Sequence, residues 1–431
     1  MAPDLPEDLL REILKHVRGS SRNIPSDSKH LLRITSLVSP TFREISQEFL
    51  FEKLDLGPMS RVPRAGEDSC LGAKLLSLFT QSPKLATLVK YVDLDDSYAE
   101  GVEGTCSSWL HIDNDISPAL RYIPLQRIVG FRFMGVDWNQ LPPQTRCAII
   151  VICRAPELKT LVLGEVPPGM LDVCGPSIKD LTLCGPFRLG GQQEQQQAAS
   201  KLTLERLTVN SILGLEGVHF ALDPSNRIAT NRLVSLNVKT GMACYDDAVI
   251  GRLLESCAPS LECFVYRTSY NLFHFVAGSE APQFDLSKLS ALKLLAFRYI
   301  HHCDPRPSLA DTVLPFLLPL FHTLPSLSPL ENFYLHAEHE DPTALFHMAS
   351  STSMWDQFDT LFADRSRFPN LKCVRITVTC GFLDASAGED TVLYVEEIVR
   401  KIGLHLRRLT RAGILVAEKS TDNAVPDYEW S

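Results

Sequence analysis

Histidine and cysteine side chains that could bind a metal or act in catalysis gather at two places in the chain. His301, His302 and Cys303 are adjacent in RYIHHCDPRP, and His336 and His339 stand three apart in HAEHED. A zinc site needs a tetrahedral ligand set, which three consecutive residues rarely supply. The second pair lacks the HExxH order of a metalloprotease helix, and its sequence reads as a strand. We therefore predict no metal site, and the first cluster is expected either in a loop or as histidines with satisfied hydrogen bonds.

The acidic residues do not predict a calcium site, and the motifs of hydrolases and phosphate-binding loops are absent from the sequence. The run DLDDS, residues 93–97, lacks the ligand spacing of a calcium loop, so we predict a solvated loop. The nucleophile-elbow pattern GxSxG and the glycine-rich phosphate loops do not occur. The sequence therefore predicts no catalytic residues and no cofactor, and an enzyme with a site assembled from dispersed residues is a distant alternative.

Length, charge and cysteine usage narrow the class of protein. The 431 residues exceed one ordinary core of ~150 residues and predict several domains or one elongated repeat array. A net charge of −9 argues against a nucleic-acid partner. The most apolar stretch, residues 312–321, contains two prolines and is shorter than the ~20 residues of a membrane span. Twelve cysteines without a CxxC pair indicate reduced, buried thiols and a cytoplasmic or nuclear protein.

The first fifty residues predict three short helices. Apolar side chains recur at helical spacing in LPEDLLREILKHV, residues 5–17, and again in KHLLRITSLV, residues 29–38. Ser39 and Pro40 suit the cap and first turn of a third helix, TFREISQEFLF. These helices form a unit distinct from the rest of the chain.

Beyond residue 50 the chain repeats the phrase L-x-x-L-x-L, with other apolar residues substituted. Its fourth position falls at residues 54, 92, 131, 161, 181, 207, 236, 264, 295, 333 and 374. The steps run from 20 residues (161 to 181) to 41 residues (333 to 374), and the middle ones fall in or near the ~20–29 residues of leucine-rich repeats. Each phrase predicts one strand that points alternate apolar side chains into a core.

Several segments between the phrases have helical periodicity, including residues 246–257, 343–366 and 389–406. A strand, a turn, a helix and the next strand imply a parallel sheet with helices on its outer side. The low-complexity segment 190–200 predicts a surface loop, and residues 419–431 predict a polar tail. The predicted fold class is therefore α/β, with domains at 1–50, 51–418 and 419–431.

The opening resembles an F-box, in the looser variant seen in large sets of fungal proteins. The resemblance covers roughly residues 4–56 and is carried by LPEDLL, Ile13-Leu14, Leu31-Leu32-Arg33, Ser36-Leu37-Val38-Ser39 and Phe42-Arg43. Ser39-Pro40 and Phe42 stand where the family usually has a cysteine or basic residue and a tryptophan. The remainder resembles the irregular leucine-rich-repeat region found behind such F-boxes.

The resemblance implies a non-catalytic subunit of a ubiquitin ligase. Its helices would bind a Skp-type adaptor, and through it a cullin, while the repeats would bind a protein substrate. The apolar residues expected to form the adaptor surface are Leu5, Pro6, Leu9, Leu10, Ile13, Leu32, Leu37, Val38 and Phe42. The alternative for each is a place in the internal core or against the first turn of the solenoid, as expected for Leu14, Val17 and Ile45.

The substrate face is not set by the sequence. Solenoids bind through a concave sheet or through loops at one edge. The variable positions of the phrases could face outward there, or could be solvated residues without a partner; examples are Lys159, Thr160, Lys179, Asp180, Glu205 and Arg206. A leucine-rich-repeat scaffold without a ligase remains the alternative function.

Overall fold

The computed structural model describes residues 6–18, 26–57, 71–96, 109–135, 138–164, 166–185, 201–211, 216–223, 227–240, 247–271, 284–302, 313–339, 345, 349, 352–380 and 389–419. The chain divides into two compact units, Met1–Leu202 and Thr203–Ser431. This division falls inside the range 51–418 that the sequence treated as one region. The predicted loop at 190–200, the tail beyond residue 419, Leu5 and Cys303 lie outside the described residues.

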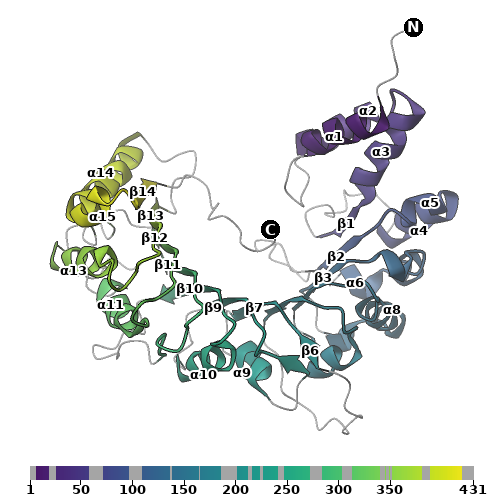
Figure 1. The fold of residues 1–431 in the computed structure, drawn as a ribbon. Coiled ribbons are helices and arrows are strands. Elements are labelled where there is room, and N and C mark those ends of the chain that lie inside the picture. Colours follow the sequence, from purple (N-terminus) through teal and green to yellow (C-terminus); the bar gives the residue numbers. More distant parts are fainter. Residues whose placement is uncertain are drawn as a thin grey trace. The chain divides into compact units, whose positions relative to one another are not determined.

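The first unit opens with the three helices that the sequence predicts. They are α1 (Glu7–Arg18), α2 (Ser26–Thr35) and α3 (Pro40–Phe51) (Figure 1). Ser39 caps α3 as expected, because its hydroxyl accepts a hydrogen bond from the Phe42 N–H at 3.3 Å. Pro40 occupies the first turn, where a missing N–H costs nothing.

A parallel sheet follows in the first unit, with its strands in chain order. Its strands are β1 (Lys53–Leu56), β2 (Tyr91–Asp95), β3 (Gly130–Met134), β4 (Thr160–Gly164) and β5 (Asp180–Cys184). The segments between them are α4 (Leu71–Gln81), α5 (Pro83–Ala86), α6 (Trp109–Ile112), α7 (Ile116–Leu120), η2 (Leu125–Arg127), η3 (Trp138–Gln140), α8 (Pro143–Cys153) and η4 (Pro168–Val173).

The second unit continues the same plan. Its parallel strands, again in chain order, are β7 (Arg206–Ser211), β9 (Ser235–Thr240), β10 (Cys263–Asn271), β11 (Leu294–His302), β12 (Asn332–His339), β13 (Cys373–Cys380) and β14 (Leu415–Lys419). Its helices are α9 (Glu216–Leu222), α10 (Asp247–Cys257), α11 (Val313–Thr323), α13 (Thr352–Ala363), α14 (Glu389–His405) and α15 (Arg407–Arg411). The short strands β6 (Leu202–Thr203) and β8 (Ile228–Ala229) pair separately.

All eleven phrases form strands, and the phrase also sets their register. Within each unit, the fourth position of one phrase pairs with the fourth position of the next, as Leu236 does with Phe264 and Phe264 with Leu295. From Val92 to Val374 these side chains are no more than 2% exposed. The prediction of an α/β fold with a parallel sheet is therefore confirmed, and each unit stacks its strands around one apolar layer.

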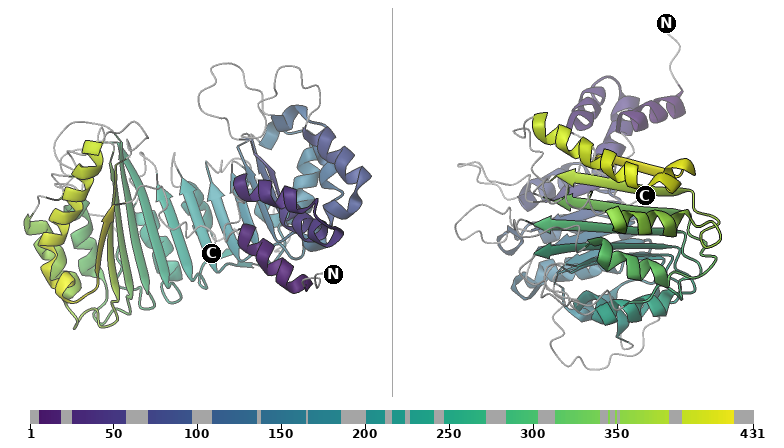
Figure 2. Two further views of the ribbon diagram at one scale, coloured as in Figure 1. Left: turned by 90° about the horizontal axis from the view of Figure 1, so that it is seen from above. Right: turned by 90° about the vertical axis from the view of Figure 1, so that its left-hand side faces the viewer.

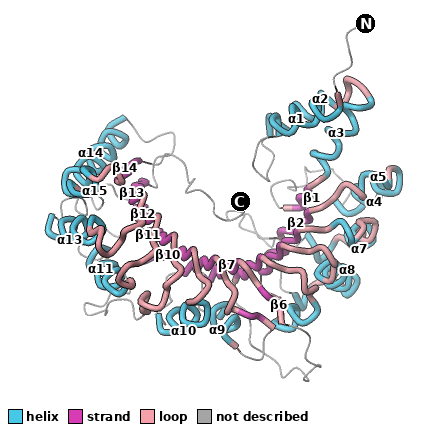
Figure 3. Tube along the Cα trace, viewed as in Figure 1, coloured by secondary structure: helices cyan, strands magenta, loops and turns pink. Residues whose placement is uncertain are grey.

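Aromatic packing shows which side of the second unit's sheet faces the helices. The ring of Phe333 on β12 lies 5.1 Å from that of Phe321 on α11 and 4.6 Å from that of Phe362 on α13. The helices of this unit lie along one face of its strands (Figures 2 and 3). Because side chains alternate along a strand, Tyr334 and His336 face the other way. We call this opposite side the open face of the sheet.

Three details of the sequence reading are corrected by the structure. The acidic run at 93–97 is not a solvated loop, since Asp93 and Asp95 belong to β2 and are buried. His301 and His302 end β11 and are not in a loop. Strand β14 was not predicted, because its sequence, LVAEK, does not carry the phrase. Within the described residues, no helix is long and apolar enough to cross a membrane.

Candidate functional site

The three N-terminal helices have a small apolar core of their own. Leu10 and Leu14 of α1, Leu32 of α2 and Ile45 of α3 are buried together, with Phe42, Phe49 and Leu50 packed against them. Leu10 and Leu14 are four residues apart and so lie on one stripe of α1. This stripe is the contribution of α1 to the core of the helical unit.

A second apolar stripe of α1 is left at the surface. Leu9 is 50% exposed and Ile13 is 46% exposed, and these two residues are also four apart. Neighbouring positions on a helix are rotated by about 100°, so the two pairs face different directions, and in this unit the pair Leu10 and Leu14 is the one that reaches the core. The Leu9–Ile13 stripe is therefore not part of the core of the helical unit.

The next segments expose further apolar side chains. Leu31 and Ile34 of α2 are each about half exposed, and Leu37 and Val38, in the turn before α3, are 77% and 66% exposed. Among the described residues, twelve large hydrophobic side chains are exposed, and six of them lie between residues 9 and 38. Such a concentration in one short part of a protein is typical of an interaction site. We call these six residues the N-terminal apolar surface.

Two of the residues expected at the adaptor surface take the alternative place, in the internal core. Leu10 is 6% exposed and Leu32 is fully buried, because both are needed for the core of the helical unit. Phe42 is half-buried and packs against that core. Pro6, Leu9, Ile13, Leu37 and Val38 are exposed, and so are Leu31 and Ile34, which the expected set did not include. Leu14 and Ile45 are internal as expected, and Val17 is half-buried.

Polar contacts attach the helices to the first strands of their unit. The Arg18 guanidinium lies 2.8 Å from the Glu52 carboxylate and stacks over the Phe49 ring at 5.6 Å. Lys90 reaches the other oxygen of Glu52 at 3.1 Å. Between α2 and α3, the hydroxyls of Thr35 and Ser46 are 3.0 Å apart. These contacts fix the helices that carry the N-terminal apolar surface to one another and to the residues beside the first strands.

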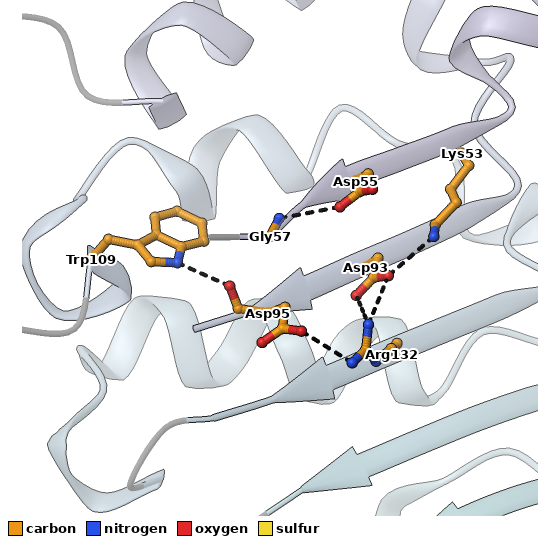
Figure 4. Close-up of polar contacts among 7 residues, drawn as sticks. All are labelled: Lys53, Asp55, Gly57, Asp93, Asp95, Trp109 and Arg132. Atoms are coloured by element: carbon orange, nitrogen blue, oxygen red, sulfur yellow. Dashed lines mark hydrogen bonds and ion pairs between the residues drawn. The ribbon is translucent and has the colours of Figure 1, made fainter. Parts of the chain in front are cut away.

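On the open face of the first unit's sheet, charged side chains form a compact network (Figure 4). Arg132 of β3 bridges two carboxylates of β2, at 3.3 Å from Asp93 and 3.0 Å from Asp95. Lys53 of β1 contacts Asp93 at 3.2 Å. The Trp109 indole donates a hydrogen bond to the backbone carbonyl of Asp95 at 3.3 Å.

This network neutralises its own charges. Burial alone would lower the pKa of Arg132, but the carboxylates of Asp93 and Asp95 raise it above its ordinary value. The two acids are therefore held by two cations, Arg132 and Lys53, and the four side chains form an internal set of ion pairs. No group of His, Cys, Asp and Glu residues in the described part of the chain could hold a metal ion.

The open face of the second unit carries a different set of charges. Lys239, Arg267, Arg298 and His336 are in register on β9, β10, β11 and β12. Glu338 pairs with Arg298 at 2.8 Å, and the His336 Nε2 lies 3.0 Å from the Thr379 hydroxyl. Burial and the positive charges of Arg298 and Arg267 lower the pKa of His336 to about 3, so the imidazole is neutral.

Sequence reasoning missed this row, although the repeat phrase could have revealed it. Each of the four residues stands three positions after the fourth position of its phrase, just beyond the last apolar residue. The predicted outward positions were only partly correct. Lys159, Glu205 and Arg206 are exposed, Lys179 and Asp180 are intermediate, and Thr160 is buried because Asp180 on the next strand packs beside it, with the two side chains 3.4 Å apart.

Two buried cysteines of the described part of the chain have thiols with a raised pKa. Most of the described cysteines are buried, although Cys147 is exposed. The hydrogen bond to Cys174, together with burial, raises the pKa of Cys153 well above its ordinary value, and burial raises that of Cys257 to about 12. A thiol with a raised pKa is a poor nucleophile, since the thiolate is the reactive form.

No known family model matches this sequence, and no curated protein is significantly similar to it.

Proposed function

We propose that the chain is the substrate-recognition subunit of a Skp–cullin–F-box ubiquitin ligase. The observation that carries this proposal is the N-terminal apolar surface, six exposed side chains beside an already filled core. The F-box resemblance assigns this surface to a Skp-type adaptor. Each parallel-sheet unit offers a sheet face and strand-end loops of the kind that repeat proteins use to bind other proteins.

The proposed mechanism needs no bond chemistry from this chain. A subunit that holds a substrate beside a ubiquitin-charged enzyme raises the effective concentration of the two reactants. The adaptor surface must then stay separate from the substrate surface. In this chain the helical unit has a core of its own, so its outer stripe is free for a partner without any rearrangement of the repeats.

The test is co-purification of the adaptor with the double variant Leu9→Asp/Ile13→Asp. Both side chains are about half exposed, so the helices should keep their fold. Burying a leucine or isoleucine contributes ~1.5–3 kcal/mol, so losing two should weaken adaptor binding by about 100-fold or more. Leu10→Asp is avoided, because Leu10 is buried in the core and its loss would unfold the unit.

Leu404→Asp is the matched control, since Leu404 of α14 is 51% exposed and lies in the second unit. It should retain the adaptor. Equal recovery of the adaptor with the double variant and the control would contradict the proposal. A folded chain that never retains an adaptor would favour the alternative, a repeat scaffold whose helices only cap the first unit.

A further inference from the structure

Serine followed by proline occurs four times in the chain, and the structure separates the four serines by exposure. The pairs begin at Ser39, Ser82, Ser117 and Ser328. Ser117 is 1% exposed and Ser328 is fully buried, whereas Ser39 and Ser82 are half-buried and stand directly before helices. A Ser-Pro pair is the sequence that proline-directed protein kinases phosphorylate. Of the four serines, only Ser39 and Ser82 reach the surface, where a kinase would meet them.

The backbone at Ser39 also has the shape that a kinase needs. Ser39 has a φ of −155° and a ψ of 166°, so it is extended, as expected for the residue before a proline. Leu37 and Val38, which precede it, are 77% and 66% exposed, and Pro40 is exposed as well. Ser82 is less extended, with a ψ of 72°. Because kinases bind the residues around the acceptor as an extended strand, Ser39 is the better acceptor of the two.

Ser39 adjoins the N-terminal apolar surface, since Leu37 and Val38 belong to that surface. A phosphate on Ser39 would carry a charge of about −1.5 to −2. A partner that covers Leu37 and Val38 would have to remove water from this charge, which costs far more than covering a hydroxyl. The phosphate oxygens can still accept the Phe42 N–H, as the Ser39 hydroxyl does at 3.3 Å. The modification would therefore change the surface and leave the cap of α3 in place.

We propose that Ser39 is the phosphorylation site of a proline-directed kinase, and that its phosphate closes the N-terminal apolar surface to the adaptor. The Ser39 Oγ attacks the γ-phosphorus of ATP, the new Oγ–P bond replaces the bond to the leaving ADP, and the hydroxyl proton passes to the catalytic carboxylate of the kinase. As regulation of the adaptor site this inference rests on the proposed function, whereas the modification of Ser39 does not.

The first test is phosphorylation of the full chain by a cyclin-dependent kinase and by a mitogen-activated kinase, in separate reactions with Mg²⁺ and ATP. Mass spectrometry of the tryptic peptide 34–43 should show one phosphate, on Ser39. Pro40→Ala is the matched variant, because it keeps the hydroxyl and places a good helix former in the first turn of α3. It should lower the rate by at least about tenfold, or ~1.4 kcal/mol. Absence of phosphate from Ser39, or an equal rate for Pro40→Ala, would overturn the assignment.

The second test compares Ser39→Asp with Ser39→Asn in binding to the Skp-type adaptor. Both side chains cap a helix about as well as serine, and only aspartate adds a charge. Ser39→Asp and the phosphorylated chain should therefore bind the adaptor at least about tenfold more weakly than the unmodified chain, a change of ~1.4 kcal/mol, while Ser39→Asn should bind as the unmodified chain does. Equal binding by the two variants would overturn the regulatory role.

The two tests also separate a failure of this inference from a failure of the proposed function. If the unmodified chain retains no adaptor, the proposed function fails and the regulatory role fails with it, while a phosphate found on Ser39 still supports the modification. Leu9→Asp/Ile13→Asp should be phosphorylated at the same rate as the unmodified chain, because it leaves the Ser39-Pro40 pair and the cap of α3 unchanged. A lower rate would show that the kinase reads the apolar surface and not the Ser-Pro pair, contrary to the assignment.

Discussion

Replacing His336 should change how the second unit responds to acid. His336 is buried on β12 between the charges of Arg298 and Arg267, and its Nε2 contacts the Thr379 hydroxyl. In the unfolded chain the same imidazole would titrate near its ordinary pKa of about 6.5. The folded unit therefore resists a proton that the unfolded chain accepts.

The sign and size of the effect follow from this difference. The pKa in the folded state is lowered to about 3, so the stability due to His336 is fully present above pH 6.5 and is lost as the pH falls toward 3. Each pKa unit corresponds to about 1.4 kcal/mol, and the two units between pH 6.5 and pH 4.5 amount to roughly 2.5 kcal/mol. His336→Gln cannot titrate, and its amide can still bond to Thr379.

The assay must report on the second unit alone. Trp355 of α13 is fully buried in this unit, so its fluorescence follows unfolding there when Trp109, Trp138 and Trp430 are replaced by phenylalanine. Urea unfolding of this background, with and without His336→Gln, should be compared at pH 7 and pH 4.5. The carboxylates titrate equally in both proteins, so subtracting the two losses isolates His336.

The variant should lose less stability on acidification, by roughly 2.5 kcal/mol. Equal losses in the two proteins would refute the reasoning, since they would show that His336 takes up a proton in the folded unit as readily as in the unfolded chain. The positive field assigned to Arg267 and Arg298 would then be wrong as well.

Two other substitutions test single contacts, one inside each unit. Asp359 of α13 accepts hydrogen bonds from the Arg408 and Leu409 N–H groups at 2.9 Å and so caps α15, and Asp359→Ala should cost the second unit about 2–3 kcal/mol in urea unfolding, with Asp359→Asn in between. If Asp359→Ala left the free energy of unfolding unchanged, the cap would not contribute to the stability of the second unit. Gly130→Ala would place a Cβ 2.5 Å from the Tyr91 ring, so it should destabilise the first unit by about 1–2 kcal/mol, and the added change Tyr91→Ser should remove most of that penalty. Additive losses in the double variant would contradict the clash.

Much of the fold could be predicted because one position of the repeat phrase determines both the burial and the register of each strand. Leu236, Phe264 and Phe333 occupy the same position of successive phrases, and that position sets both the buried side of each strand and its register. The two apolar stripes of α1 were also visible in the sequence. Which stripe is internal was not, because Leu9 and Leu10 are equally apolar and only the packing of Leu32 and Ile45 separates them.

The polar face was harder to predict, because its residues have no common type. The position after the fourth residue of the phrase holds Asp93 on β2, Arg132 on β3 and Ala296 on β11. Burial of Asp93 depends on Lys53 and Arg132, which come from strands on either side of it in the sheet. A single charged residue in the sequence therefore suggests a solvent-exposed position. The same residue can be buried when side chains of opposite charge lie on the neighbouring strands.

The same reasoning explains why the two open faces differ in the order of their charges. Both are built from positions that the apolar core leaves free to vary. In the first unit opposite charges alternate between strands, so Arg132 and Lys53 are matched by Asp93 and Asp95 and gain little from another ion. In the second unit Lys239, Arg267 and Arg298 follow one another without alternation. Among the described residues of that row, the opposite charge comes from Glu338 of β12, which pairs with Arg298 of β11 at 2.8 Å, so a charged position on this face is again stabilised by the neighbouring strand.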